Sequence, residues 1–161
     1  MSISTLFKRM THYLLFALIS FTLIPYGFAN SSESKATSVD QRSIHAADEN
    51  READNWLSYG RGYFEQRHSP LKHINQHTVD QLKLAWFFDT GNTQGLQATP
   101  LVIDGVMYIT AAWSVLHALD AKTGEELWRF DPEVPREESF RYCCGVVNRG
   151  AAAWQNNLFI G

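Results

Sequence analysis

The chain has 161 residues, of which 45% are hydrophobic, and a formal net charge of −3. This length suffices for one small domain. The slightly acidic balance, without a basic stripe, excludes a nucleic-acid-binding protein of the usual electrostatic kind.

Residues 1–29 have the features of a secretory signal peptide. Lys8 and Arg9 form a basic start, residues 13–24 are apolar, and residues 27–29 end in small side chains that suit cleavage. The apolar run is shorter than the ~20 residues that a membrane span needs, although an uncleaved anchor stays open as the alternative. We therefore expect export to the periplasm and no transmembrane span after cleavage.

Residues 30–54 are rich in Ser, Ala and charged side chains and contain few apolar residues. Such a composition cannot bury enough apolar surface to order the backbone. It predicts a flexible leader over residues 30–54 and a folded part over residues 55–161.

The first predicted element is a short helix over residues 76–82, capped by Asn75. His73 and His77 are four residues apart, a spacing that can ligate a metal on one face of a helix. No third ligand stands nearby, and His73 precedes the cap. Solvent-facing histidines are the interpretation that the pattern favours.

From residue 84 onward the pattern changes to short apolar runs separated by tight turns. Asp104-Gly105 is typical of a type I′ hairpin turn, because both residues tolerate positive φ. The pattern predicts an antiparallel meander. Its strands are expected over residues 84–88, 99–103, 106–110, 115–119 and 126–130.

Residues 151–161 begin the same pattern again, with an apolar strand, a polar turn at Asn156-Asn157 and a second apolar strand. One full unit followed by the start of another indicates a repeat architecture. Because such units need neighbours on both sides, we expect the chain to be the N-terminal piece of a larger protein.

Cys143 and Cys144 are adjacent and are the only cysteines. In an exported chain their only intramolecular partners are each other. Consecutive Cα atoms lie ~3.8 Å apart, whereas disulfides usually span ~4.4–6.8 Å. A bond between them would be strained and would stabilise little, so a binding or chemical role, or a redox switch, is the better hypothesis.

Residues 118–128 resemble the tryptophan-docking repeat of quinoprotein propellers. In that resemblance Asp120 and Thr123 hydrogen-bond the turn, Gly124 supplies positive φ, and Trp128 packs against the next blade. Asp120 is therefore interpreted as a structural residue and not as a catalytic one.

A second set of motifs extends over roughly residues 54–161. Its members are Asn55-Trp56, Tyr59-Gly60-Arg61, Gln66-Arg67, Ser69-Pro70-Leu71, Ile74-Asn75, 82–86, 98–102, Asp104-Gly105, Trp113-Ser114, Cys143-Cys144 and 146–150. This set resembles the pyrroloquinoline-quinone (PQQ)-dependent alcohol dehydrogenases. The resemblance implies an all-β fold, namely an eight-bladed quinoprotein-type β-propeller of which this chain supplies the lead-in segment, about one blade and the start of the next.

The same resemblance implies the cofactor-binding residues. A Cys143–Cys144 disulfide would lie against the quinone, and Arg149 would donate to its oxygens; a surface ion pair is the alternative for Arg149. Gln97 stands where the family usually carries Glu, and its amide could keep the cofactor contact without a negative charge. Gly145 also departs from the Asp that is common in the family.

By resemblance the activity is two-electron oxidation of an alcohol, aided by a carboxylate base and a Ca²⁺ or lanthanide ion, with electrons passed to a c-type cytochrome. The base and the metal ligands are expected downstream, so no catalytic or metal residue is assigned here and the fragment alone should be inactive. Cys-x-x-Cys-His is absent, so haem c could belong only to a downstream domain. The alternative is a non-catalytic exported propeller that acts as a scaffold or binding protein.

Overall fold

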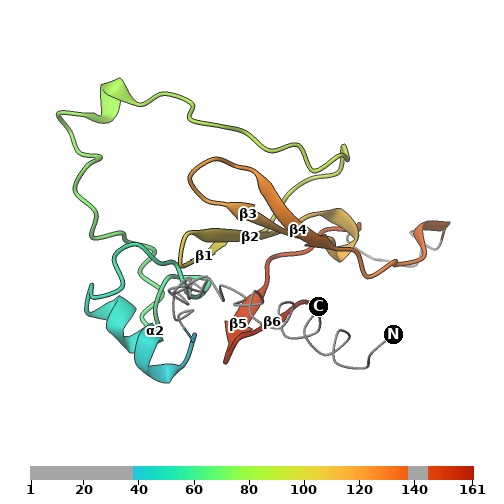
Figure 1. Cartoon of the computed structure of the whole chain (residues 1–161), viewed down its shortest axis with the longest axis horizontal. Coiled ribbons are helices and arrows are strands. Elements are labelled where there is room, and N and C mark those ends of the chain that lie inside the picture. The colour runs from blue at the N-terminus through green and yellow to red at the C-terminus, as the bar shows by residue number, and fades with distance from the viewer. Residues whose placement is uncertain (1–37, 138–144) are drawn as a thin grey trace, which may run out of the picture. The chain divides into compact units, whose positions relative to one another are not determined.

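A computed structural model describes residues 38–137 and 145–161, which belong to one compact unit, Ser34–Gly161. Its centre is an antiparallel sheet of four sequential strands, shown in Figure 1. The predicted meander is confirmed for the last four of its five expected strands. They are β1 (Leu101–Ile103), β2 (Val106–Thr110), β3 (Leu116–Asp120) and β4 (Glu126–Phe130).

The turn between β1 and β2 has the predicted geometry. Asp104 and Gly105 adopt φ angles of 50° and 79°, and Ile103 pairs with Val106 across the turn. Two successive positive φ angles match the right-handed twist of the flanking strands. Local turn chemistry therefore fixes the register of the first hairpin.

Burial differs sharply between the last two strands. Residues 116–119 of β3 are all buried, with Ala118 and Leu119 at most 1% exposed. Every residue of β4 is exposed; Trp128 packs its ring 5.9 Å from that of Tyr108 yet stays 44% exposed. Burial raises the pKa of the Tyr108 hydroxyl, with a further contribution from the charge of Asp104.

The expected strand over residues 84–88 is wrong, because no residue there pairs with a strand. The segment is instead fixed by its side chains. Trp86 donates from its indole nitrogen to the Ala121 carbonyl (3.3 Å), and Phe88 meets the His117 ring edge-on at 5.1 Å. Leu84 and Phe87 are 79% and 80% exposed.

The start of a second unit is confirmed as a separate hairpin of β5 (Ala152–Trp154) and β6 (Asn157–Phe159). The positive φ angles fall on Gln155 and Asn156, at 46° and 65°, so the turn lies one residue earlier than predicted.

The expectation of a flexible leader up to residue 54 is wrong for the described part of that segment. Residues 41–48 form helix α2 (Gln41–Asp48). Asp40 accepts from the Ser43 amide (2.8 Å), and the Ser43 hydroxyl accepts from the Asp40 amide (2.9 Å), which completes a capping box. The hydrogen bond from the Ser43 amide lowers the pKa of the Asp40 carboxyl.

Helix α2 is stabilised by apolar packing that the composition of residues 30–54 does not predict. Ile44 is 7% exposed and forms a small core with Val39 and Leu57, against which Ile103 and Ala153 pack. The amide of Gln155 donates to the Val39 carbonyl (2.8 Å). A few apolar residues thus suffice to order the segment, because they meet partners from both hairpins.

Residues 55–57 then run along the edge of the sheet. The amide of Trp56 donates to the Val102 carbonyl (2.8 Å), and the Val102 amide donates back (3.0 Å). Arg61, 5% exposed, donates to the carbonyls of Ala47 and Glu52, so its charge faces the C-terminal end of α2.

The predicted helix over residues 76–82 is reduced to a single 3₁₀ turn, Val79–Gln81. Asn75 caps no helix; its side-chain oxygen accepts from the His77 amide (2.9 Å). His73 and His77 are exposed, as expected, and residues 38–137 and 145–161 contain no group of three or more potential metal ligands.

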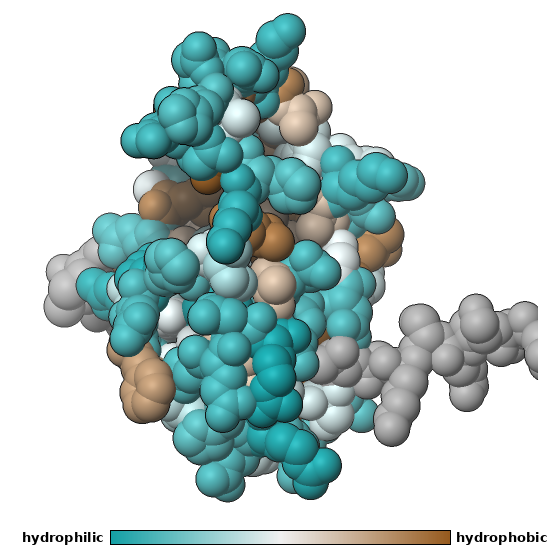
Figure 2. All heavy atoms as spheres, turned by 90° about the vertical axis from the view of Figure 1, so that its left-hand side faces the viewer, coloured by the Kyte–Doolittle hydropathy of each residue, from teal (hydrophilic) through white to brown (hydrophobic). Residues whose placement is uncertain are grey.

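The surface of the lead-in segment combines polar and apolar side chains. Figure 2 shows a largely hydrophilic face on which apolar side chains are exposed in small groups. Within the described ranges, no helix has the length and apolar character needed to cross a membrane.

Candidate functional site

Cys143 and Cys144 lie outside the described residues, so their disulfide and their place against a quinone stay predictions. The described chain resumes at Gly145 with a φ of 81°. What the structure does locate is the segment that follows the cysteines, from Gly145 to Gly150.

The structure brings the segments of Gln97 and Arg149 together. The amide of Thr99 donates to the Arg149 carbonyl (3.4 Å). Gly150 has a φ of 128°, and a Cβ atom there would lie 3.1 Å from the Thr99 carbonyl oxygen. Glycine is therefore required for this close approach.

The side chains of Gln97 and Arg149 are both exposed, and neither donates a hydrogen bond to another described residue. An amide and a guanidinium so placed offer several hydrogen-bond donors and one positive charge. The pair suits an acidic, planar ligand better than an apolar one, because a guanidinium forms paired hydrogen bonds with carboxylate or carbonyl oxygens.

The neighbouring Asn148 side chain makes three hydrogen bonds. Its Nδ2 donates to Ser114 Oγ and to the Gly161 carbonyl, both at 2.9 Å, and its Oδ1 accepts from the Gly150 amide at 2.9 Å. Ser114 Oγ also donates to the Gly161 carbonyl (2.8 Å). We call Ser114, Asn148 and the Gly161 carbonyl the asparagine node.

The backbone under this node is left-handed at two consecutive residues, Trp113 and Ser114, with φ angles of 64° and 56°. Non-glycine residues rarely adopt this conformation. The Trp113 amide donates to the Val146 carbonyl (2.8 Å), and the Arg136 guanidinium lies 5.8 Å from the Trp113 ring. A cavity of about 350 Å³ adjoins the node, lined by Trp113, Ser114, Val134, Gly145, Val146, Val147 and Gly161.

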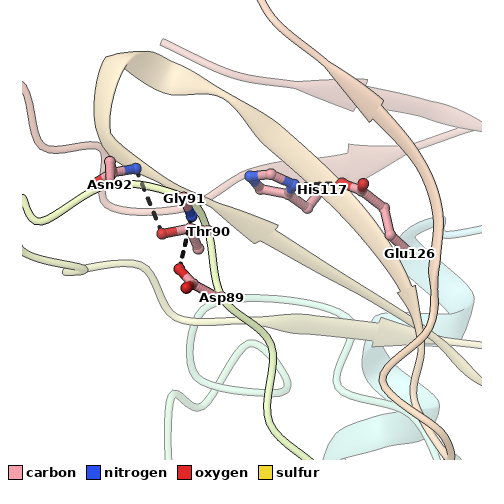
Figure 3. A network of polar contacts seen from close by, with 6 residues as sticks. All are labelled: Asp89, Thr90, Gly91, Asn92, His117 and Glu126. Atoms are coloured by element: carbon pink, nitrogen blue, oxygen red, sulfur yellow. Dashed lines mark hydrogen bonds and ion pairs between the residues drawn. The ribbon is translucent and has the colours of Figure 1, made fainter.

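A second polar pair, which the sequence did not predict, lies inside the sheet. His117 of β3 is 3% exposed and its Nδ1 lies 2.7 Å from Glu126 Oε1 of β4 (Figure 3). Its Nε2 is buried without a partner among the described residues. The turn at Asp89–Asn92 drawn beside it is held separately, by the Gly91 amide on Asp89 Oδ1 (2.8 Å) and Asn92 on Thr90 (3.4 Å).

Comparison with known proteins identifies the family. Residues 56–158 match the family model described as "PQQ: Glucose/ethanol/alcohol dehydrogenase, beta-propeller domain". The chain belongs to this family. The match confirms the predicted family and the β-propeller class of this PQQ domain.

Individual relatives agree with this result. The dehydrogenase subunit of alcohol dehydrogenase (quinone) from Komagataeibacter europaeus is 46% identical over 136 residues, which are 84% of this chain and 18% of that protein. Quinohemoprotein alcohol dehydrogenase from Comamonas testosteroni superposes with a TM-score of 0.72 at 42% identity, covering 76% of this chain and 18% of that one. A europium-containing methanol dehydrogenase gives a TM-score of 0.65 at 31% identity, over 74% of this chain and 21% of that one.

The chain therefore spans about one fifth of the length of the relatives that it matches. These relatives are alcohol or methanol dehydrogenases by name, and the chain corresponds to a part of each of them.

Proposed function

We propose that the protein containing this chain oxidises alcohols with PQQ as its cofactor. The observation that carries this proposal is the close approach of the Gln97 and Arg149 segments, joined by the Thr99–Arg149 hydrogen bond, in a chain of this family. Their exposed amide and guanidinium have the donor chemistry that an acidic quinone requires.

In this proposal Arg149 donates to the oxygens of the cofactor and contributes the positive charge of the site. Gln97 donates from its amide, which needs no proton uptake next to a carboxylate. Cys143 and Cys144 form the disulfide against one face of the ring. When bound, the quinone supplies a two-electron acceptor for the hydride of the alcohol.

The remaining features of the proposal rest on the family. They are an eight-bladed propeller, export to the periplasm after removal of residues 1–29, and transfer of electrons to a c-type cytochrome or to a haem c domain. We assign no base and no metal ligand to the described residues. The europium in the name of one relative supports a lanthanide as an alternative to Ca²⁺.

The test is a titration of the full-length protein with PQQ, in parallel with Ca²⁺ and with a lanthanide, followed by the quinone absorbance. We expect saturable binding in the presence of at least one metal, and quinone reduction on addition of a primary alcohol. If the protein binds no quinone with either metal, the non-catalytic exported propeller becomes the better reading.

If the protein binds quinone but an added alcohol does not reduce it, the proposed binding site stands and the proposed alcohol oxidation is wrong. Arg149→Ala should weaken quinone binding by about 10–100-fold, because a charge-assisted hydrogen bond contributes roughly 1.5–3 kcal/mol. Unchanged affinity in this variant would remove Arg149 from the site.

A further inference from the structure

We propose that Asn148 and Ser114 are positioning residues for the cofactor site: through the asparagine node they fix the backbone on both sides of Arg149. This inference rests on the proposed function, and it assigns a task to two side chains that need not touch the cofactor.

The first argument is the placement of the hydrogen bonds along the chain. Asn148 precedes Arg149, and its side chain accepts from the amide of Gly150, which follows Arg149. The carbonyl of Arg149 itself accepts from Thr99. The Arg149–Gly150 peptide is thus held through both its carbonyl and its amide, and Asn148 is anchored through its side chain. The guanidinium stays exposed and forms no hydrogen bond or ion pair with another described residue.

The second argument is the conformational free energy that the left-handed backbone at Ser114 costs. A left-handed backbone at a non-glycine residue costs roughly 1–2 kcal/mol, and Trp113 and Ser114 both adopt it. Such conformations persist where the surroundings over-determine them, and they concentrate at functional sites. Glycine would relieve this strain but would remove the Oγ that joins Asn148 to the Gly161 carbonyl.

The physical consequence is preorganisation. A cationic side chain on a loosely held loop must lose backbone freedom when it binds a ligand, and that loss weakens affinity. The node removes the loss in advance. Asn148 and Ser114 should therefore influence quinone affinity only through Arg149.

The experiment is a double-mutant cycle in the full-length protein, with PQQ as the titrated ligand. Asn148→Ala removes three side-chain hydrogen bonds and Ser114→Ala removes two. Because their loss reaches the quinone only through Arg149, each change should raise the Kd about 3–10-fold. In an Arg149→Ala background the same changes should alter the Kd less than about 2-fold, since coupled residues are not additive. Asn148→Ala should also shift the absorbance maximum of bound quinone in the direction that Arg149→Ala shifts it.

Thr123→Val is the matched control, because it deletes a hydroxyl hydrogen bond to Asp120 in a turn whose hydrogen bonds do not involve the node. It should leave the Kd and the spectrum unchanged. Amide exchange of the apoprotein gives a readout that needs no quinone: Asn148→Ala should accelerate exchange over residues 145–150, and Thr123→Val should not.

Equal losses of affinity with and without Arg149 would overturn this inference and leave the proposed function intact. So would unchanged amide exchange in Asn148→Ala. Failure of the wild-type protein to bind quinone would overturn the proposed function, and with it the role given to Arg149.

Discussion

Two tight turns in this chain hold their backbones by opposite means. The turn between β3 and β4, residues 120–124, is called the docking turn and is built from neighbours in sequence. Asp120 Oδ1 accepts from the Lys122 amide, the Thr123 amide and the Thr123 hydroxyl at 2.8–3.0 Å. The asparagine node joins residues 114, 148 and 161, which are far apart in sequence. The docking turn is specified by its local sequence, whereas the asparagine node forms only when three separate segments of the chain come together.

The two turns also differ in how they use left-handed backbone. The docking turn places it on Gly124, at a φ of 76°, where no Cβ opposes it. At the asparagine node the left-handed conformation falls on Ser114 and on the preceding Trp113, where it is costly. A turn with a purely structural role should place its left-handed conformation on glycine, where the conformational cost is small. A turn that positions a functional side chain can keep a non-glycine residue there.

The largest expected effect tests how closely the docking turn is packed. A Cβ atom at Gly124 would lie 2.5 Å from Trp86 Cε3, whereas Gly105, with a similar φ of 79°, has nothing within 4 Å. Gly105→Ala should cost only the conformational penalty, about 1–2 kcal/mol, and Gly124→Ala should cost about 3 kcal/mol or more because Trp86 must also move. Equal shifts of the denaturation midpoint in the full-length protein would show that Trp86 is not docked on this turn.

An intermediate effect is expected at the buried pair that links β3 to β4. Glu126→Ala leaves His117 Nδ1 buried without its acceptor, which should cost about 1–3 kcal/mol. Adding His117→Leu should recover part of that loss, because the double variant has no unsatisfied ring nitrogen. Thermal unfolding of both variants measures the difference, and a double variant less stable than Glu126→Ala contradicts the interpretation.

The smallest expected effect is a pH dependence of the docking turn. The Thr123 amide and hydroxyl, with the Lys122 amide, lower the pKa of the Asp120 carboxyl below its ordinary value of 3.8. The unfolded chain therefore binds the proton more readily than the folded protein, so the stabilisation is fully present above pH 3.8 and is lost as the pH falls through the lower folded pKa. Stability profiles of the wild type and Asp120→Asn should converge below that range, and parallel profiles would contradict this assignment.

The same contrast explains what the sequence could predict. Asp104-Gly105 and residues 120–124 specify their turns through nearest neighbours, so the meander and the structural role of Asp120 were readable from the pattern. Family resemblance, and not local pattern, pointed to Gln97 and Arg149. The hydrogen bond that brings their segments together depends on long-range contacts that no local pattern contains.

The failures have identifiable physical causes. Trp86 lies in an apolar run typical of a strand, but its indole docks on a turn and its backbone pairs with no strand. Helix α2 was missed because its core needs only Val39 and Ile44 from its own segment and takes the remainder from Leu57, Ile103 and Ala153. The average composition of residues 30–54 does not reveal so few apolar contacts.

That small core has a consequence for the order in which the chain is completed. The Val39 carbonyl is made early in synthesis, but the Gln155 amide that it accepts from is made more than a hundred residues later. Helix α2 therefore cannot reach its final packing until the second hairpin has been synthesised, and loop-closure entropy makes such distant pairing slow. Until then the Val39 carbonyl lacks its hydrogen-bond donor and Ile44 lacks part of its apolar partners, so the segment that carries α2 keeps these groups exposed in the incomplete chain.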